Sequence, residues 1–280
     1  MGTPRRFGWL VLLVLVLAAC GDSNDGTSGA GGSKPTPPSS TIGKEFSGLV
    51  DIGGGRKVFA ECTGSGEPTV LLESGDEGYH AQWASVVAGL GGPTRICTYD
   101  RFGNGASDPA TGCRHMKELR GDLEALLRAL GEDGPYVLVG HSGGGFLMAG
   151  FAYAHPDEVA GLVLVETPRA IIPEEVPAAL LAELKCDSPD NQERRDYVQV
   201  EHEAWTGRHK IGNIPVTVIS NDYGNNYSNE EQRTNVADQK GWLVLSPQAR
   251  QVVVTSGHAV PSTEPALVVE EILRVLKAAR

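Results

Sequence analysis

The sequence predicts an α/β fold in which helices flank a mostly parallel sheet. Short apolar runs alternate along the chain with helix-length segments, the pattern of strand–helix–strand units. At 137–154 an apolar run, a serine enclosed by glycines and a helix-length segment follow one another directly. The 280 residues are 40% hydrophobic and 21% charged, which is enough for one sizeable domain with a complete core.

The serine turn is the most specific feature of the sequence. Gly140, Gly143 and Gly144 leave space for a sharp turn that holds the Oγ atom of Ser142 out at the tip of the strand. A glycine-rich junction of this kind can also bind phosphate, but neither the Gly-Lys-Ser/Thr of a Walker loop nor a G-x-G-x-x-G motif is present here. We therefore predict that Ser142 is a nucleophile and not a structural turn residue.

With these residues the sequence resembles the α/β-hydrolase superfamily, in the serine esterase, lipase and peptidase-like branch with a GHSGG turn. The resemblance covers about residues 45–280. Further matching motifs are Ser74-Gly75-Asp76, Tyr99-Asp100-Arg101-x-Gly103-x-Gly105-x-Ser107-Asp108, the run 161–166, and Ser256-Gly257-His258 followed by Pro265. The resemblance implies an eight-stranded, mostly parallel sheet flanked by helices, with a helical cap between the sixth and seventh strands at about 171–210.

The first half of the predicted domain begins with two edge strands, 45–51 and 56–62, joined by three glycines that are typical of a hairpin turn. The apolar run 69–73 leads into a loop, as a buried strand does at its C-terminal end. The segment 81–90 has apolar residues at helical spacing and ends in Gly-Gly-Pro, so we expect a helix there. The next strand is expected at 94–99.

The second half continues the alternation of helices and strands. The segment 116–130 has leucines on one face and charged residues on the other, and ends before a glycine, as an amphipathic helix packed on the sheet does. The serine strand follows, and its helix is expected at 146–154. The remaining strands and the closing helix are expected at 160–165, 214–220, 251–255 and 265–278.

His258 is predicted to be the general base. The chain has seven histidines, and only His258 combines a position after a strand end with the order Ser…acid…His. His141 adjoins the nucleophile, and we expect the turn to direct its ring away from the serine Oγ. His155, at a helix end before a proline, is expected to cap the helix or lie on the surface.

Two carboxylates are candidates for the acid of the triad. Glu166 ends the strand next to that of the nucleophile, and its separation of 24 residues from Ser142 suits one strand–helix–strand step. Asp222 follows the expected seventh strand, where most branches of the resembled superfamily place the acid. Because Asp222 does not align with the usual Gly-x-x-Asp turn, we favour Glu166 and keep Asp222 as the alternative.

The resemblance also implies an oxyanion hole made by the backbone amides of Gly143 and Asp76. The superfamily usually has His-Gly-x after the third strand, and here Ser74 replaces the histidine while Asp76 takes the donor position. A carboxylate beside a developing oxyanion would be unfavourable, so we expect the Asp76 side chain to point away from it. We expect Asp100 and Arg101 to brace their own loop.

Four cysteines follow Cys20, and an even number in an exported chain favours disulfides over a metal site, since no C-x-x-C or Cys/His cluster is present. Buried free thiols are the alternative. In the resembled fold the second strand lies antiparallel to the fourth, which implies a Cys62–Cys97 disulfide. That pairing leaves Cys113–Cys186 to join the loop after the fourth strand to the cap.

The segment 1–19 has the composition of a targeting signal. Arg5 and Arg6 precede the apolar stretch 9–19, which is too short to span a bilayer comfortably and ends at Cys20. It resembles a bacterial lipoprotein signal, which implies cleavage before Cys20, a lipid on the sulfur of Cys20, and a location outside the cytoplasm on the cell membrane. Ordinary secretion and an uncleaved anchor are the alternatives.

Residues 20–44 are rich in Gly, Ser, Thr and Pro and have almost no large apolar side chain. Such a segment cannot bury enough surface to offset the ordering of its backbone, so we predict a tether between the lipid and the domain 45–280. The net charge of −11 argues against nucleic acid or an anionic membrane surface as a partner, because both bind clustered Lys and Arg.

These residues predict a carboxylesterase-like or lipase-like serine hydrolase that acts on a small-molecule ester without a metal or other cofactor. An aminopeptidase or amidase would use the same triad. A catalytically silent protein of this fold that binds a ligand is the third possibility. A serine at the turn, in place of an aspartate, argues against the dehalogenase and epoxide-hydrolase branches.

Overall fold

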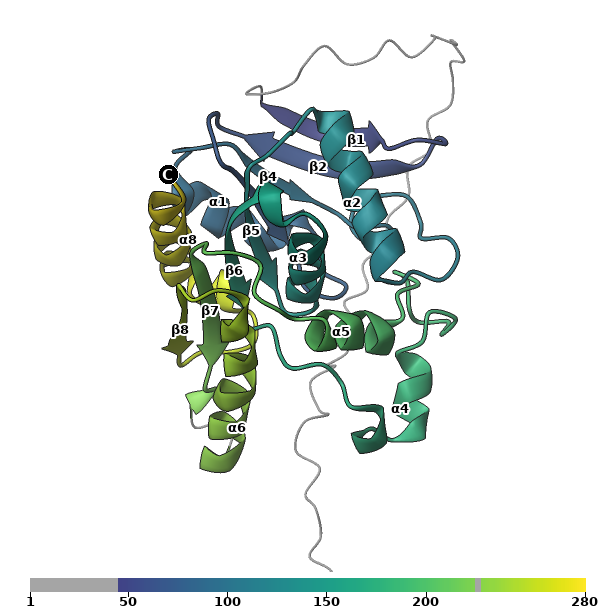
Figure 1. Ribbon diagram of the computed structural model, residues 1–280. Coiled ribbons are helices and arrows are strands. Elements are labelled where there is room, and N and C mark those ends of the chain that lie inside the picture. Colours follow the sequence, from purple (N-terminus) through teal and green to yellow (C-terminus); the bar gives the residue numbers. More distant parts are fainter. Residues whose placement is uncertain (1–44, 225–227) are drawn as a thin grey trace, which may run out of the picture. The chain divides into compact units, whose positions relative to one another are not determined.

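The computed structural model describes residues 45–224 and 228–280 (Figure 1). These residues belong to one of the two compact units of the chain, Ser40–Arg280. The expected signal, Cys20 and the expected tether lie outside the described residues. Among the helices that are described, none is both long and apolar enough to cross a bilayer.

An eight-stranded sheet forms the centre of this unit, in the order β1-β2-β4-β3-β5-β6-β7-β8. β2 runs antiparallel to both of its neighbours, and the other described pairs are parallel. The strands are β1 (Phe46–Asp51), β2 (Lys57–Thr63), β3 (Thr69–Glu73), β4 (Ile96–Tyr99), β5 (Tyr136–His141), β6 (Val159–Val165), β7 (Val216–Asn221) and β8 (Ala249–Val254). The predicted fold class is confirmed, and each predicted strand is present.

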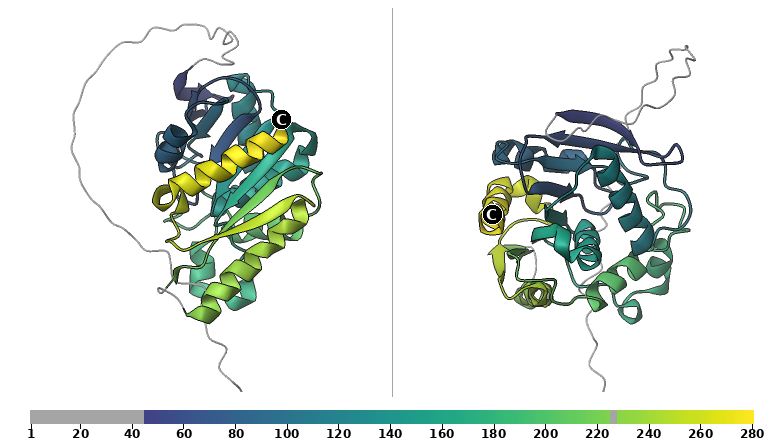
Figure 2. Two further views of the ribbon diagram at one scale, coloured as in Figure 1. Left: turned by 90° about the vertical axis from the view of Figure 1, so that its left-hand side faces the viewer. Right: turned by 45° about the horizontal axis from the view of Figure 1, so that its top comes forward.

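Helices cover both faces of the sheet, and Figure 2 shows α8 lying across the strands on one of them. The helices of the domain body are α1 (Ala84–Leu90), α2 (Met116–Leu130), α3 (Gly143–Ala154), α6 (Asn229–Gln239), α7 (Val260–Thr263) and α8 (Pro265–Ala279). Side chains of the strands alternate between the two faces: Val70 and Leu72 pack with α1 and α8, whereas Leu71 packs with α2 and α3.

Most predicted helices have the expected bounds, and two differ at their N-termini. The expected helix 81–90 begins as a 3₁₀ turn, His80–Trp83, before α1. The helix after the serine begins at Gly143 because Ser142 itself is its N-cap. Two further 3₁₀ segments, Pro156–Glu158 and Lys240–Leu245, precede β6 and β8.

A helical cap lies between β6 and β7. It contains a 3₁₀ turn (Pro173–Glu175), α4 (Ala178–Glu183) and α5 (Tyr197–Thr206). The hydroxyl of Tyr153 in α3 donates a hydrogen bond to the carbonyl of Ala204 in α5, with 3.1 Å between the oxygens. An isolated β-bridge between Arg114 and Arg195 joins the cap to the chain after β4.

Both expected cysteine pairs are present. Cys62 and Cys97 are direct partners in the antiparallel pairing of β2 with β4, with their Cα atoms 4.1 Å apart. Cys113 and Cys186 join the chain after β4 to the cap, with their Cα atoms 5.1 Å apart. The first pair is buried within the body and the second crosses from the body to the cap.

Candidate active site

Ser142 lies between β5 and α3 with φ 49° and ψ −125°, a strained conformation for a residue with a side chain. Glycines are required around Ser142, because a side chain at these positions would overlap neighbouring atoms. A Cβ atom at Gly140 would lie 2.6 Å from the Cα of Gly145, and one at Gly144 would overlap the carbonyl oxygen of Ser74. The turn therefore has the tight geometry that the glycine spacing predicted.

His258 lies in the loop between β8 and α7 and faces the serine. Its Nε2 is 2.9 Å from the Oγ of Ser142. The ring of His141 does not point to the serine: its Nε2 donates to the carbonyl of His258 at 2.8 Å, and its Nδ1 is 2.8 Å from the side-chain nitrogen of Gln82. Burial and the neighbouring His258 lower the pKa of His141 to about 3, so His141 is neutral and supports the backbone of His258.

Glu166 lies at the end of β6, where its carboxylate is buried. The Oε2 accepts a hydrogen bond from the amide of Asn221 at 2.7 Å. The Oε1 accepts from the hydroxyl of Tyr223 at 2.8 Å and from the Nδ2 of Asn235 at 3.1 Å. Burial raises the pKa of Glu166, and the hydrogen bonds from Tyr223 and Asn235 oppose that rise.

Tyr223 follows β7 and lies between Glu166 and His258. Its hydroxyl oxygen is 3.4 Å from the Nδ1 of His258. Within the described residues, the carboxylate of Glu166 forms no hydrogen bond or ion pair with the imidazole of His258. Asp222, the alternative acid, instead accepts a hydrogen bond from the amide of Gly224 at 3.0 Å. The structure thus brings Glu166 toward His258 through Tyr223, a residue that no sequence pattern marks.

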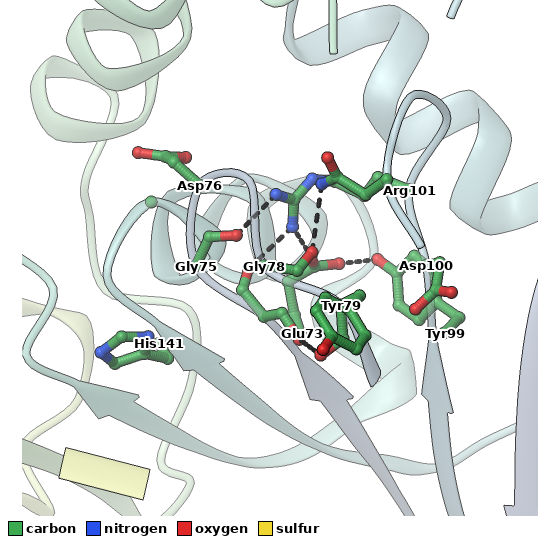
Figure 3. Close-up of polar contacts among 12 residues, drawn as sticks. Glu73, Gly75, Asp76, Gly78, Tyr79, Tyr99, Asp100, Arg101 and His141 are labelled. Carbon is green, nitrogen blue, oxygen red and sulfur yellow. Dashed lines mark hydrogen bonds and ion pairs between the residues drawn. The ribbon is translucent and has the colours of Figure 1, made fainter. Parts of the chain in front are cut away.

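The loop after β3 passes close to the serine. A Cβ at Gly75 would lie 3.3 Å from the Cβ of Ser142. In the described part of the chain, the amides of Asp76 and Gly143 donate no hydrogen bond to another protein group. The Asp76 carboxylate pairs with Arg195 of the cap at 2.5 Å and lies against Gly143, where an added Cβ would overlap it. Figure 3 shows it turned away from His141.

Arg101 is buried at the centre of a charged cluster that joins this loop to the cap (Figure 3). It donates to the carbonyl oxygens of Ser74 and Gly75, both at 2.7 Å, and forms an ion pair with Glu73. It also binds both carboxylate oxygens of Glu193, at 2.7 and 2.8 Å. The Arg101 side chain therefore braces the loop after β3 against the cap. The expectation that it braces its own loop is wrong.

Arg101 pairs with both carboxylates of this cluster, and it compensates the charge of Glu193 more completely than that of Glu73. Burial raises the pKa of Glu73 to about 7, although Arg101 opposes the rise. Burial alone would raise the pKa of Glu193 as well, but the charge and hydrogen bonds of Arg101 lower it to about 2. No sequence pattern predicted the roles of Glu193 and Arg195, because charged residues in a Glu- and Arg-rich segment are usually exposed.

One grouping among the described residues has the spacing of metal ligands, namely Cys62, Cys97 and Glu132. The two sulfurs are bonded to each other, so they offer no thiolate to a metal ion. The grouping also lies away from Ser142, since Cys62 and Cys97 pair within β2 and β4.

Residues 68–209, half of the chain, match the protein family described as having the alpha/beta hydrolase fold. The protein therefore belongs to the alpha/beta hydrolase family. The solved structure of a thermophilic esterase from Thermogutta terrifontis has the same fold, with a TM-score of 0.64 and 23% sequence identity. That similarity covers 84% of this chain and 99% of the esterase chain.

Three curated proteins are similar in sequence. The chain is 36% identical over 128 residues to the probable transporter efuK of Hormonema carpetanum, covering 43% of this chain and 18% of that protein. It is 24% identical over 219 residues to the uncharacterized protein YqjL of Bacillus subtilis (strain 168), covering 73% and 82%. It is 31% identical over 113 residues to the putative carbamate hydrolase RutD of Azorhizobium caulinodans, covering 40% and 42%. The first and third matches span less than half of those proteins.

Proposed function

We propose that the protein is a serine hydrolase that cleaves carboxylic esters. The observation that carries the proposal is the 2.9 Å contact between the Nε2 of His258 and the Oγ of Ser142 at the tip of β5. Membership of the alpha/beta hydrolase family supports it. The buried carboxylate of Glu166 behind the histidine, and the two unpaired amides beside the serine, supply the other parts that acyl transfer needs.

In the proposed reaction His258 removes the proton of Ser142 as the Oγ attacks the ester carbonyl. The amides of Gly143 and Asp76 stabilise the negative charge that develops on the carbonyl oxygen. Glu166 stabilises the positive charge that forms on the imidazole. The imidazolium then gives its proton to the leaving alkoxide, and a water molecule activated by the same histidine releases the acyl group from the serine.

Labelling with a fluorophosphonate, read by intact mass, tests this proposal. The wild-type protein should gain one adduct, the Ser142→Ala variant should gain none, and His258→Ala should react far more slowly because its serine is no longer activated. Circular dichroism shows whether each variant is folded. If folded wild-type protein remains unlabelled, the nucleophile assignment is wrong and a catalytically silent protein becomes the better description.

An amidase or carbamate hydrolase is the second candidate, and the similarity to a putative carbamate hydrolase favours including it. The same serine and histidine would attack either carbonyl, and the difference lies in how readily the leaving nitrogen is protonated. A panel of substrates with one acyl group and either an alcohol, an amine or a carbamate leaving group separates the two. Faster turnover of the nitrogen leaving groups would replace the esterase proposal.

We also propose that the protein is exported and held on the cell membrane by a lipid on Cys20, as residues 5–20 suggest. The two disulfides support an oxidising compartment. Metabolic labelling with a fatty acid, followed by membrane fractionation, tests this in the source cell. Wild-type protein should carry the label and sediment with membranes, whereas Cys20→Ala should do neither. A labelled Cys20→Ala protein would contradict the proposal.

A further inference from the structure

The hydroxyl of Tyr223 lies between His258, the proposed base, and Glu166, the proposed acid. It donates to the Oε1 of Glu166 at 2.8 Å, and its oxygen is 3.4 Å from the Nδ1 of His258. A phenol can do both, because its oxygen accepts a hydrogen bond while its proton is donated elsewhere. The Nδ1–H of His258 can therefore be accepted by Tyr223, whose own proton points to the buried carboxylate.

The backbone holds Tyr223 in this place at a cost. Its φ is 59°, and Ser142 and Glu166 also have positive φ, so three of the five such non-glycine residues described are in this one site. Strain of this kind persists only when the surroundings enforce it, and it concentrates at functional sites. The Oδ1 of Asn221 accepts hydrogen bonds from the amides of Tyr223 at 2.8 Å and Ser256 at 3.0 Å, which joins the loop of Tyr223 to the loop of His258.

We propose that Tyr223 is a positioning residue through which Glu166 holds the imidazole of His258 and stabilises its positive charge during acyl transfer. This inference rests on the proposed function. No proton is transferred to Glu166 in this arrangement: the Nδ1 of His258 keeps its proton, the Tyr223 hydroxyl keeps its own, and both hydrogen bonds shorten as positive charge develops on the imidazole.

Among the side chains that the structure describes, few others near His258 could take this role. The ionisable or hydroxyl-bearing residues that face it there are Ser142, Glu166, Tyr223 and His141, whose ring centroid is 4.9 Å away. His141 remains neutral because burial lowers its pKa to about 3. A change in the pH dependence of catalysis after loss of the Tyr223 hydroxyl therefore reports on the link to Glu166.

The Tyr223→Phe variant, assayed with 4-nitrophenyl acetate, tests the inference. The kcat/KM should fall about 10- to 100-fold, the loss expected for one hydrogen bond that strengthens with charge in the transition state, and KM should change little. The acid limb of the pH profile of kcat/KM should move to lower pH, because the imidazolium is less stabilised. Tyr136→Phe is the matched control, since its hydroxyl donates to the Glu132 carbonyl at 2.6 Å at the other end of β5.

A double-mutant cycle with Glu166→Gln shows whether the hydroxyl acts through the carboxylate. If it does, Tyr223→Phe adds little to the loss that Glu166→Gln causes alone. Tyr223→Gly is a second variant, because glycine adopts positive φ without strain and keeps the loop conformation while removing the hydroxyl. It should lose activity as Tyr223→Phe does.

Three results would overturn the inference. The first is a Tyr223→Phe variant with the kcat/KM and pH profile of the wild type, and the second is a double variant whose fold-loss equals the product of the two single losses. The third is full activity in Tyr223→Gly. Fluorophosphonate labelling separates this failure from failure of the proposed function. If wild-type protein is labelled at Ser142 and Tyr223→Phe is labelled at the same rate, only the role of Tyr223 is wrong. If folded wild-type protein is not labelled, both are wrong.

Discussion

Two clusters of buried residues adjoin the serine, one with two carboxylates and the other with one. The clusters differ in which groups contact the negatively charged carboxylates. In the first, Glu73 and Glu193 share the guanidinium of Arg101. In the second, Glu166 accepts hydrogen bonds from a backbone amide, a side-chain amide and a phenol, all of which are neutral. One cluster contains its own counter-ion and the other does not.

The difference separates a structural cluster from a reactive one. Arg101 compensates its carboxylates in the resting protein, so the first cluster is suited to holding the loop after β3 against the cap. Glu166 is surrounded by neutral hydrogen-bond donors, and in the proposed reaction the positive charge that can reach it is the one that forms on His258. A carboxylate that no cation neutralises in the resting protein can stabilise positive charge that develops only in the transition state.

The largest expected effect concerns the cluster without a counter-ion. Glu166→Gln should lower kcat/KM about 10³- to 10⁴-fold while the protein remains folded, because the amide keeps the size of the side chain and removes its charge. Ester hydrolysis and circular dichroism measure the two properties. Asp222→Asn is the matched control and should retain activity, since Asp222 contacts the amide of Gly224. A large loss in Asp222→Asn alone would instead make Asp222 the acid.

The next effect concerns the cluster with a counter-ion. Arg101→Met should lower the free energy of unfolding by about 3–5 kcal/mol, because it leaves Glu193 buried without its cation. Urea denaturation measures this change. Arg56→Met removes a surface ion pair with Asp122, in which the arginine side chain is 45% exposed, and should cost about 1 kcal/mol or less. Equal stabilities of the two variants would show that the Arg101 cluster is not structural.

The smallest effect, measured as the change in stability per pH unit, concerns Glu201, a buried cap carboxylate that accepts a hydrogen bond from the amide of Ile171 at 3.1 Å. Burial and the nearby Asp76 raise the pKa of Glu201 to about 8. Between the ordinary pKa of a glutamate, about 4.3, and this value, the folded protein holds a proton that the unfolded chain releases. Stability should therefore fall as pH rises through that window.

Glu201→Gln should remove this contribution, flattening the pH dependence by up to about 1.4 kcal/mol per pH unit. The slope that remains comes from other groups with shifted pKa values, among them Glu73, Glu166 and His141. Urea denaturation of both proteins at several pH values measures it. A variant that loses stability in parallel with the wild type from pH 5 to 8, as read at about unit intervals, would show that Glu201 is ionised in the folded protein.

Local patterns predicted the parts of the molecule that local geometry controls. The glycines around Ser142 predicted its turn because only they fit there, and the leucine spacing predicted α2. The Cys62–Cys97 pair followed from the strand neighbours of the resembled fold. Arg101 and Glu193, in contrast, are 92 residues apart, and nothing near either one in the sequence shows that they meet.

Tyr223 was missed for a different reason. Its position depends on where the loop after β7 meets the end of β6, and a tyrosine in a loop is usually interpreted as ordinary packing. The place of Glu166 at the end of β6 was predicted because the end of a strand can be located from sequence. The partner of its carboxylate was not found, since hydrogen bonds between loops follow from tertiary structure.

The cap is attached to the body at several points. Cys186 is bonded to Cys113, Glu193 to Arg101, and Arg195 to Asp76. A segment held by a covalent bond, the buried Arg101–Glu193 ion pair and the partly exposed Arg195–Asp76 ion pair cannot swing aside as a hinged lid without breaking them. An esterase built in this way should show no interfacial activation: its rate should rise smoothly with dissolved ester and show no jump when the substrate begins to form droplets.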